Sequence, residues 1–146
     1  MRWRFSFSLL LFLLSTLLGA CSGSGQPPAP AGLPTLPPQA ILQVIRPDGK
    51  PTPFGLEDLK KLPAVQMSID GITQTGPLLS TLLAAAGVTD FTEVTLTGGG
   101  ATYRLTRAQV NEQTMLDFNN RGMVKLASTL VAKDLWVKDI TLIQVK

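Results

Sequence analysis

The order of apolar and polar residues predicts several short strands. Residues 64–69 alternate, with Val65, Met67 and Ile69 on one face, as in a strand that buries one side. Other runs are rich in β-branched and aromatic residues, and Gly, Asn and Asp between them favour turns. The predicted strands are residues 41–45, 64–69, 91–97, 101–105, 115–118, 123–126 and 135–145. The predicted turns are residues 47–49, 70–71, 98–100 and 119–122.

Two stretches have helical spacing. Leucines recur at every third position in residues 56–62, and Pro63 ends this short helix. Residues 77–86 are predicted as the clearest helix, with proline in the first turn, a largely buried leucine-rich face and Gly87 as the stop. A single helical turn capped by Thr106 is expected over residues 106–113. The pattern therefore predicts an α+β fold in one compact domain, residues 40–146.

The triple glycine at residues 98–100 has two interpretations. Glycine-rich loops bind phosphate where their backbone amides open onto a helix N-terminus. A strand follows here instead, so we interpret these residues as a plain turn.

The N-terminus has the pattern of a secretory signal. Arg2 and Arg4 precede an apolar run, residues 5–18, which is closed by the small residues Gly19 and Ala20. A helix of this run would be roughly 21 Å long at ~1.5 Å per residue, against ~30 Å for a hydrocarbon core. We therefore expect residues 1–20 to be a signal peptide rather than a membrane span.

The string Leu17-Leu18-Gly19-Ala20-Cys21 resembles the bacterial lipobox. The resemblance implies that the signal is cut before Cys21 and that this cysteine carries lipid, which would anchor the protein to a membrane. Ser22 follows where an aspartate would favour the inner membrane, so the outer membrane or the cell surface of a bacterium is expected. The alternative for Cys21 is a small apolar residue or a stray thiol.

Residues 21–39 form a predicted tether. The segment is uncharged and rich in proline, which favours extended polyproline II conformations without a packed core. A spacer between lipid and domain is the simplest interpretation, because a proline-rich ligand for an aromatic groove would be expected to have basic flanking residues.

Composition excludes several kinds of chemistry. The 146-residue chain has no His and one Cys, which excludes Ser-His-Asp and Cys-His catalysis, His-ligated zinc and an internal disulfide. Without Arg2 and Arg4, the 13 basic side chains fall to 11 against 10 acidic ones, a net charge of +1. Nucleic acid is therefore not an expected partner.

From Phe54 to Lys146 the order of motifs resembles the small molybdopterin-dependent oxidoreductase-like domain of the sulfite oxidase fold. The resemblance implies a mixed sheet with short helices and a cleft for a molybdopterin cofactor. The motifs that carry it are Phe54-Gly55-Leu56-Glu57-Asp58-Leu59 with Leu62-Pro63, Gly76-Pro77-Leu78-Leu79, Leu82-Leu83, Ala85-Ala86-Gly87-Val88, Tyr103-Arg104-Leu105-Thr106, and the run from Trp136 to Val145.

The chain departs from this family at the expected metal site. Active members bind molybdenum through pterin sulfurs and one protein thiolate, which follows the strand matching residues 64–69. This chain has Ser68, Ile69, Asp70 and Gly71 there, and its sole cysteine is assigned to lipid. A hydroxyl does not replace a thiolate at such a metal. We interpret the domain as degenerate, with no cofactor expected.

Two classes of function follow. The first is a lipid-anchored, non-enzymatic domain that binds an envelope partner protein or a small ligand in the cleft, with Tyr103, Arg104 and Arg121 as candidate lining residues. The second is an enzyme that retains molybdopterin with an unusual ligand set, or that uses carboxylates such as Asp70 and Asp117. Tyr103 and the two arginines are also explained as exposed strand or turn residues.

Overall fold

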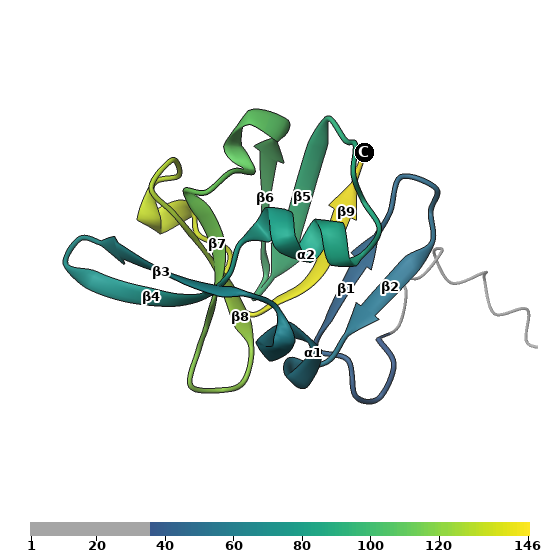
Figure 1. Ribbon diagram of the computed structural model, residues 1–146, viewed down its shortest axis with the longest axis horizontal. Coiled ribbons are helices and arrows are strands. Elements are labelled where there is room, and N and C mark those ends of the chain that lie inside the picture. Colours follow the sequence, from purple (N-terminus) through teal and green to yellow (C-terminus); the bar gives the residue numbers. More distant parts are fainter. Residues whose placement is uncertain (1–35) are drawn as a thin grey trace, which may run out of the picture. The chain divides into compact units, whose positions relative to one another are not determined.

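A five-stranded mixed sheet forms the centre of the protein (Figure 1). The computed structural model describes residues 36–146, and the predicted signal, Cys21 and most of the tether lie outside this range. The strand order is β2-β1-β9-β5-β6, with β1 parallel to β9 and the other neighbours antiparallel. The strands are β1 (Leu42–Ile45), β2 (Pro51–Phe54), β5 (Glu93–Gly98), β6 (Ala101–Thr106) and β9 (Ile140–Val145).

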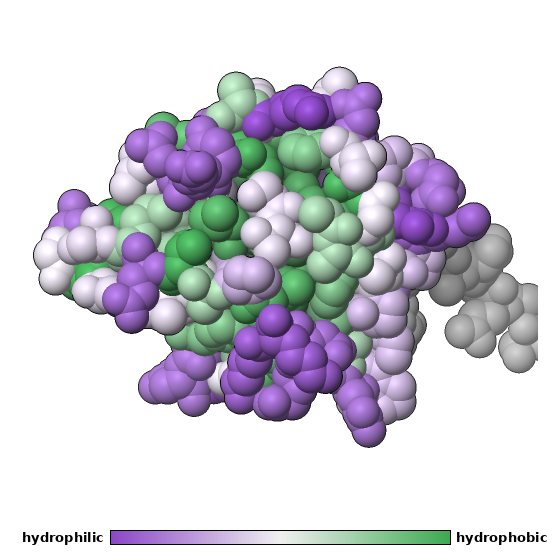
Figure 2. Space-filling model, in the orientation of Figure 1, coloured by the Kyte–Doolittle hydropathy of each residue, from purple (hydrophilic) through white to green (hydrophobic). Residues whose placement is uncertain are grey.

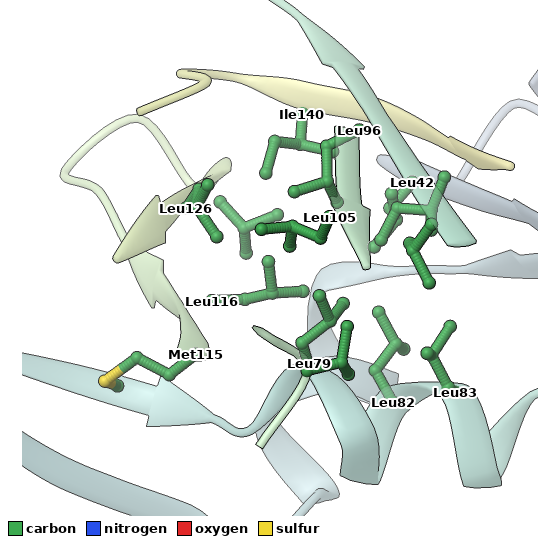
Figure 3. Packing of buried hydrophobic residues seen from close by; sticks show 14 of the residues in the cluster. Leu42, Leu79, Leu82, Leu83, Leu96, Leu105, Met115, Leu116, Leu126 and Ile140 are labelled. Carbon is green, nitrogen blue, oxygen red and sulfur yellow. The ribbon is translucent and has the colours of Figure 1, made fainter. Parts of the chain in front are cut away.

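One face of this sheet carries the hydrophobic core (Figure 3). Helix α2 (Leu79–Ala85) supplies Leu79, Leu82 and Leu83 to the core, all of them buried. Leu96 of β5 and Leu105 of β6 are fully buried in the same cluster. Gly87, at φ 78°, lies just after the helix, as the sequence predicted.

Two hairpins complete the fold. The first consists of β3 (Ala64–Ile69) and β4 (Ile72–Pro77), and the second of β7 (Thr114–Phe118) and β8 (Val124–Ser128). A bridge between Leu78 and Met115 continues the contact of β4 with β7. The β3–β4 hairpin extends away from the sheet, at the left of Figure 1.

The remaining elements are short. Helix α1 (Leu56–Lys61) precedes β3, and the 3₁₀ turns η1 (Arg107–Gln109) and η2 (Lys133–Leu135) follow β6 and precede β9. Within residues 36–146, no helix is long and apolar enough to cross a membrane.

The described domain is a single α+β unit with a mixed sheet and short helices, as predicted. Strands β1, β3, β5 and β6, both helices and the β7–β8 hairpin lie where the pattern placed them, within a few residues. The triple glycine is a plain turn, in which Gly99 and Gly100 have φ 52° and 79°.

The sequence prediction was wrong at four places, three of them near the two hairpin-forming strands β2 and β4. Residues 51–54 and 72–77 are strands that it did not contain, and Pro77 ends β4 instead of starting helix α2. Pro77 fits there because it pairs with Ala64 at the end of the hairpin and Leu78 stays extended, so the helix begins at Leu79.

The closing strand is also shorter than predicted. Residues 133–135 form η2, and Asp139 has a positive φ of 48° directly before β9 begins at Ile140. A positive φ is incompatible with the pleat of a strand, so the strand cannot extend back through Asp139, and residues 135–139 lie outside the sheet.

Candidate functional site: a cavity beside the β3–β4 turn

A cavity of about 330 Å³ lies between the end of β3 and the chain before β9. Its walls combine apolar side chains with hydroxyl, carboxylate and ammonium groups. Ser68, Ile69 and Asp70 of this wall are the residues at which the sequence resemblance predicts the family's thiolate. The lining residues are Ser68, Ile69, Asp70, Ser128, Thr129, Val131, Ala132, Lys133 and Trp136.

The β3–β4 turn forms one wall. Asp70 and Gly71 have φ 53° and 75° and join the strands directly, since Ile69 pairs with Ile72. The Asp70 carboxylate lies 3.8 Å from Nζ of Lys133, and both side chains are largely exposed. Because both groups are exposed, they are accessible to a ligand. A pair exposed in this way contributes little to the stability of the fold.

Trp136 lies in the apolar part of the wall. Its side chain is buried, and Nε1 donates a hydrogen bond of 3.0 Å to the Val131 carbonyl. Ile69 and Val131 are buried beside it in the lining. This bond fixes the indole and the chain that carries Lys133.

Ser128 is held by the protein itself. The Thr114 hydroxyl donates to the Gln109 carbonyl at 2.6 Å, which leaves the Ser128 hydroxyl as the donor in the 2.9 Å bond between the two hydroxyls. Ser128 Oγ also accepts from Leu130 N–H at 3.1 Å. The Ser128 hydroxyl is therefore structural, and Ser68 and Thr129 carry the exposed hydroxyls of the cavity.

The three candidate ligand residues from the sequence lie elsewhere. Tyr103 and Arg104 are consecutive in β6 and so point to opposite faces of the sheet. Tyr103 packs against the core, and Arg104 Nε lies 3.2 Å from a Glu93 carboxylate oxygen. Arg121 lies in the β7–β8 turn, with its guanidinium 2.5 Å from the Asp139 carboxylate. The structure does not bring the three together, and their ligand-binding role stays a prediction.

Asp117 has a structural position. Its side chain is 12% exposed, and Oδ1 accepts a 2.7 Å hydrogen bond from Thr75 N–H. Oδ2 lies 3.1 Å from Nζ of Lys125, the residue opposite Asp117 in the hairpin. The carboxylate thus joins β4 to the β7–β8 hairpin.

The Asp70 and Asp117 carboxylates lie in different places, and a catalytic use of either stays a prediction. Asp70 is at the tip of the first hairpin, and Thr75, which binds Asp117, is three strand positions beyond Ile72, about 10 Å at ~3.3 Å per residue. Among residues 36–146, no group of three or more Cys, Asp or Glu side chains is placed to bind a metal ion.

Only part of this cavity was identified from the sequence. The sequence predicts Ser68 and Asp70 at the thiolate position. Lys133 and Thr129 belong to no motif, and the sequence predicts Trp136 in the closing strand. That prediction for Trp136 is wrong because the 3₁₀ turn η2 and the positive φ at Asp139 lie between β8 and β9.

The fold is similar to that of a solved enzyme structure. The sulfane dehydrogenase SoxCD from Paracoccus pantotrophus superposes with a TM-score of 0.59 and 20% sequence identity. The match covers 71% of this chain but 37% of that chain. It supports the sulfite-oxidase-like fold that the motifs predicted. The sequence matches no protein-family model and no curated protein.

Proposed function

We propose that this chain is a lipid-anchored bacterial envelope protein whose domain binds a partner protein or a small ligand without catalysing a reaction. The anchor is Cys21, attached through the proline-rich tether, and the outer membrane or the cell surface is the proposed location. The binding site is the cavity beside the β3–β4 turn, which replaces Tyr103, Arg104 and Arg121 as our first candidate.

The observation that carries this proposal is the two-residue turn at Asp70-Gly71. At this position the family's molybdenum site requires a protein thiolate. The turn supplies a carboxylate and backbone groups, and Ser68 supplies a hydroxyl, so these residues do not fit that site. Residues 22–146 contain no cysteine, and the sulfurs of the domain belong to Met67, Met115 and Met123. A thioether is a weak, uncharged acceptor.

The cavity itself supports binding. It has an apolar part around Trp136 and a few polar groups, as small-molecule sites commonly do, and its volume lies near the lower end of their range of roughly 300–1,000 Å³. The open pair of Asp70 and Lys133 supplies one group of each charge. This set suits a small polar molecule or an inserted side chain.

The experiment is metal and pterin analysis of the full-length protein purified from its own host, together with an assay of oxygen-atom transfer to sulfite and from sulfoxides. We expect no stoichiometric molybdenum, no pterin and no turnover, with the fold retained. One equivalent of molybdopterin, or cofactor-dependent reduction of a sulfoxide, would instead show an oxidoreductase with an unusual ligand set.

A further inference from the structure

Three exposed aliphatic residues are neighbours of residues that line the cavity. Ile72, Leu130 and Leu135 are 52%, 42% and 48% exposed, and they are the exposed large hydrophobic residues among residues 36–146. Ile72 pairs with Ile69 of the cavity wall, Leu130 lies between Thr129 and Val131 of the lining, and Leu135 directly precedes Trp136.

We propose that these three residues, the hairpin–loop surface, insert into the lipid surface to which the chain is tethered. This inference rests on the lipid anchor of the proposed function, and of the two proposed occupants of the cavity it favours the small ligand, because docking turns the cavity toward the membrane. The three residues lie on two chain segments, the β3–β4 hairpin and the segment between β8 and β9, and the 3.8 Å contact of Asp70 with Lys133 joins these segments. In Figure 2, green hydrophobic residues reach the surface near the free end of this hairpin.

The small size of the surface favours lipid over a protein partner. About half of each of three side chains is exposed, far less than the ~800 Å² per partner that a stable protein interface buries. Binding hot spots between proteins are rich in Trp, Tyr and Arg, but the one aromatic side chain here, Trp136, is buried. Aliphatic side chains that insert shallowly need only hydrocarbon around them.

The charges nearby are nearly balanced. Asp70 and Lys133 form a pair, and exposed Asp134 adds one negative charge beside Leu135. The hairpin–loop surface therefore has no excess of positive charge that would attract anionic lipids. We infer that its contact with lipid is hydrophobic, and that it is insensitive to salt.

The tether is long enough for this contact. Residues 22–35, which precede the described domain, would reach roughly 43 Å if extended at ~3.1 Å per residue. A folded unit of about 110 residues has a radius of gyration of about 13 Å, or roughly 35 Å across. The domain can thus turn the hairpin–loop surface toward the membrane although β1 lies at the other side of the fold (Figure 1).

Because the domain is tethered to the membrane, even a weak contact is sufficient to keep it docked on the lipid surface. A short flexible linker holds the domain at an effective concentration in the millimolar range relative to its membrane. Burying the exposed halves of three aliphatic side chains shifts the ratio of docked to undocked domain roughly a hundredfold.

Trp136 is a built-in reporter for the test. The chain has two tryptophans, and cleavage before Cys21 removes Trp3. The substitution Trp3→Phe makes Trp136 the sole tryptophan even in protein whose signal is not cut. This protein is purified from host membranes and reconstituted into phosphatidylcholine vesicles with or without bromine on the acyl chains. We expect the brominated lipid to quench Trp136, equally at low and high salt.

Two variants locate the effect. Ile72→Ser/Leu130→Ser/Leu135→Ser is expected to reduce quenching to the background seen without bromine. The matched control, Ala101→Ser/Ala108→Ser, changes exposed apolar positions in β6 and η1 and is expected to leave quenching unchanged. Circular dichroism confirms that both variants fold.

The outcomes separate the two proposals. If the protein does not remain with the vesicles, the proposed lipid anchor is wrong, and the docking inference, which depends on that anchor, is wrong as well. If the protein remains bound but Trp136 is not quenched, the anchor stands and lipid is not the occupant, which overturns the inference. Quenching that survives the triple substitution also overturns it, because another surface must then contact the lipid.

Discussion

Gly76 of β4 lies directly against the backbone of Leu116 in β7. A Cβ atom on Gly76 would be 1.9 Å from the Leu116 carbonyl oxygen, far inside van der Waals contact. The two hairpins therefore cross with backbone against backbone, and only glycine fits at the crossing.

Gly76→Ala is accordingly expected to destabilise the domain strongly. The clash involves backbone, which cannot rotate away, so we expect a loss of about 3 kcal/mol or more in the free energy of unfolding, measured in urea. The control is Gly100→Ala, at φ 79° with nothing near its absent Cβ, for which strain alone costs about 1 kcal/mol. Equal losses in the two variants would contradict the close crossing.

Asp117→Ala is predicted to destabilise the folded domain. The substitution leaves Thr75 N–H and Lys125 without their partner, and we expect a loss of about 2 kcal/mol in the free energy of unfolding. Asp117→Asn keeps an oxygen for Thr75 and is expected to lose less. An unchanged unfolding midpoint for Asp117→Ala would show that the carboxylate does not join the hairpins.

Cys21→Ala is expected to abolish acyl labelling and to release the full-length protein from membranes. One lipidated cysteine supplies the whole anchor in our proposal, because several acyl chains at ~0.8 kcal/mol per buried CH₂ are needed for stable attachment. Metabolic labelling and detergent partitioning measure the effect. Partitioning of the variant into detergent would rule out this anchor.

Two truncations are predicted to show that the tether is dispensable for folding and that the closing strand is not. A chain that begins at Ala40 should melt near the temperature of the mature protein, because the tether offers little apolar surface to bury. A chain that stops before Leu135 lacks β9, whose Ile140 and Ile143 are fully buried, and should not melt cooperatively. Calorimetry measures both. Failure of the first chain to fold would place the domain boundary earlier in the sequence.

The pKa of Asp48 is lowered, chiefly by the hydrogen bond from Lys50 N–H and further by the charges of Arg46 and Lys50. A lowered pKa in the folded state adds stability above the unfolded pKa, and this stability is lost as pH falls through the folded value. The difference in thermal midpoint between the wild type and Asp48→Asn is therefore expected to vanish on acidification. A difference that grows at low pH would contradict the assignment.

The local pattern of apolar and polar residues was sufficient to predict the helices and strands in which that pattern is strongly periodic. Residues 64–69 alternate and lie as predicted, with exposed Gln66 and Ser68 opposite the more buried face. The strand at residues 72–77 was missed because its alternation is carried by Thr, Gln and Gly and ends in Pro77. Asp70-Gly71 is a strong hairpin signal, however, and a hairpin requires a second strand.

The site was less predictable because it depends on tertiary placement. Consecutive residues of a strand face opposite sides, so Tyr103 and Arg104 could have been separated from the sequence alone. The contact between Lys133 and Asp70 could not be predicted from the sequence. It joins positions far apart in the chain, and it depends on where the 3₁₀ turn η2 places Lys133.

The parallel pair of β1 and β9 has a consequence for the order of folding. β9 pairs with β1 on one side and with β5 on the other, so the strand that comes last in this domain completes the sheet. Until it is available, β1 with β2 and β5 with β6 are separate ribbons with unpaired edges. A contact between the two ends of the domain requires closing a loop of nearly its whole length, which slows folding. The five-stranded sheet therefore cannot assemble until β9 is present between β1 and β5.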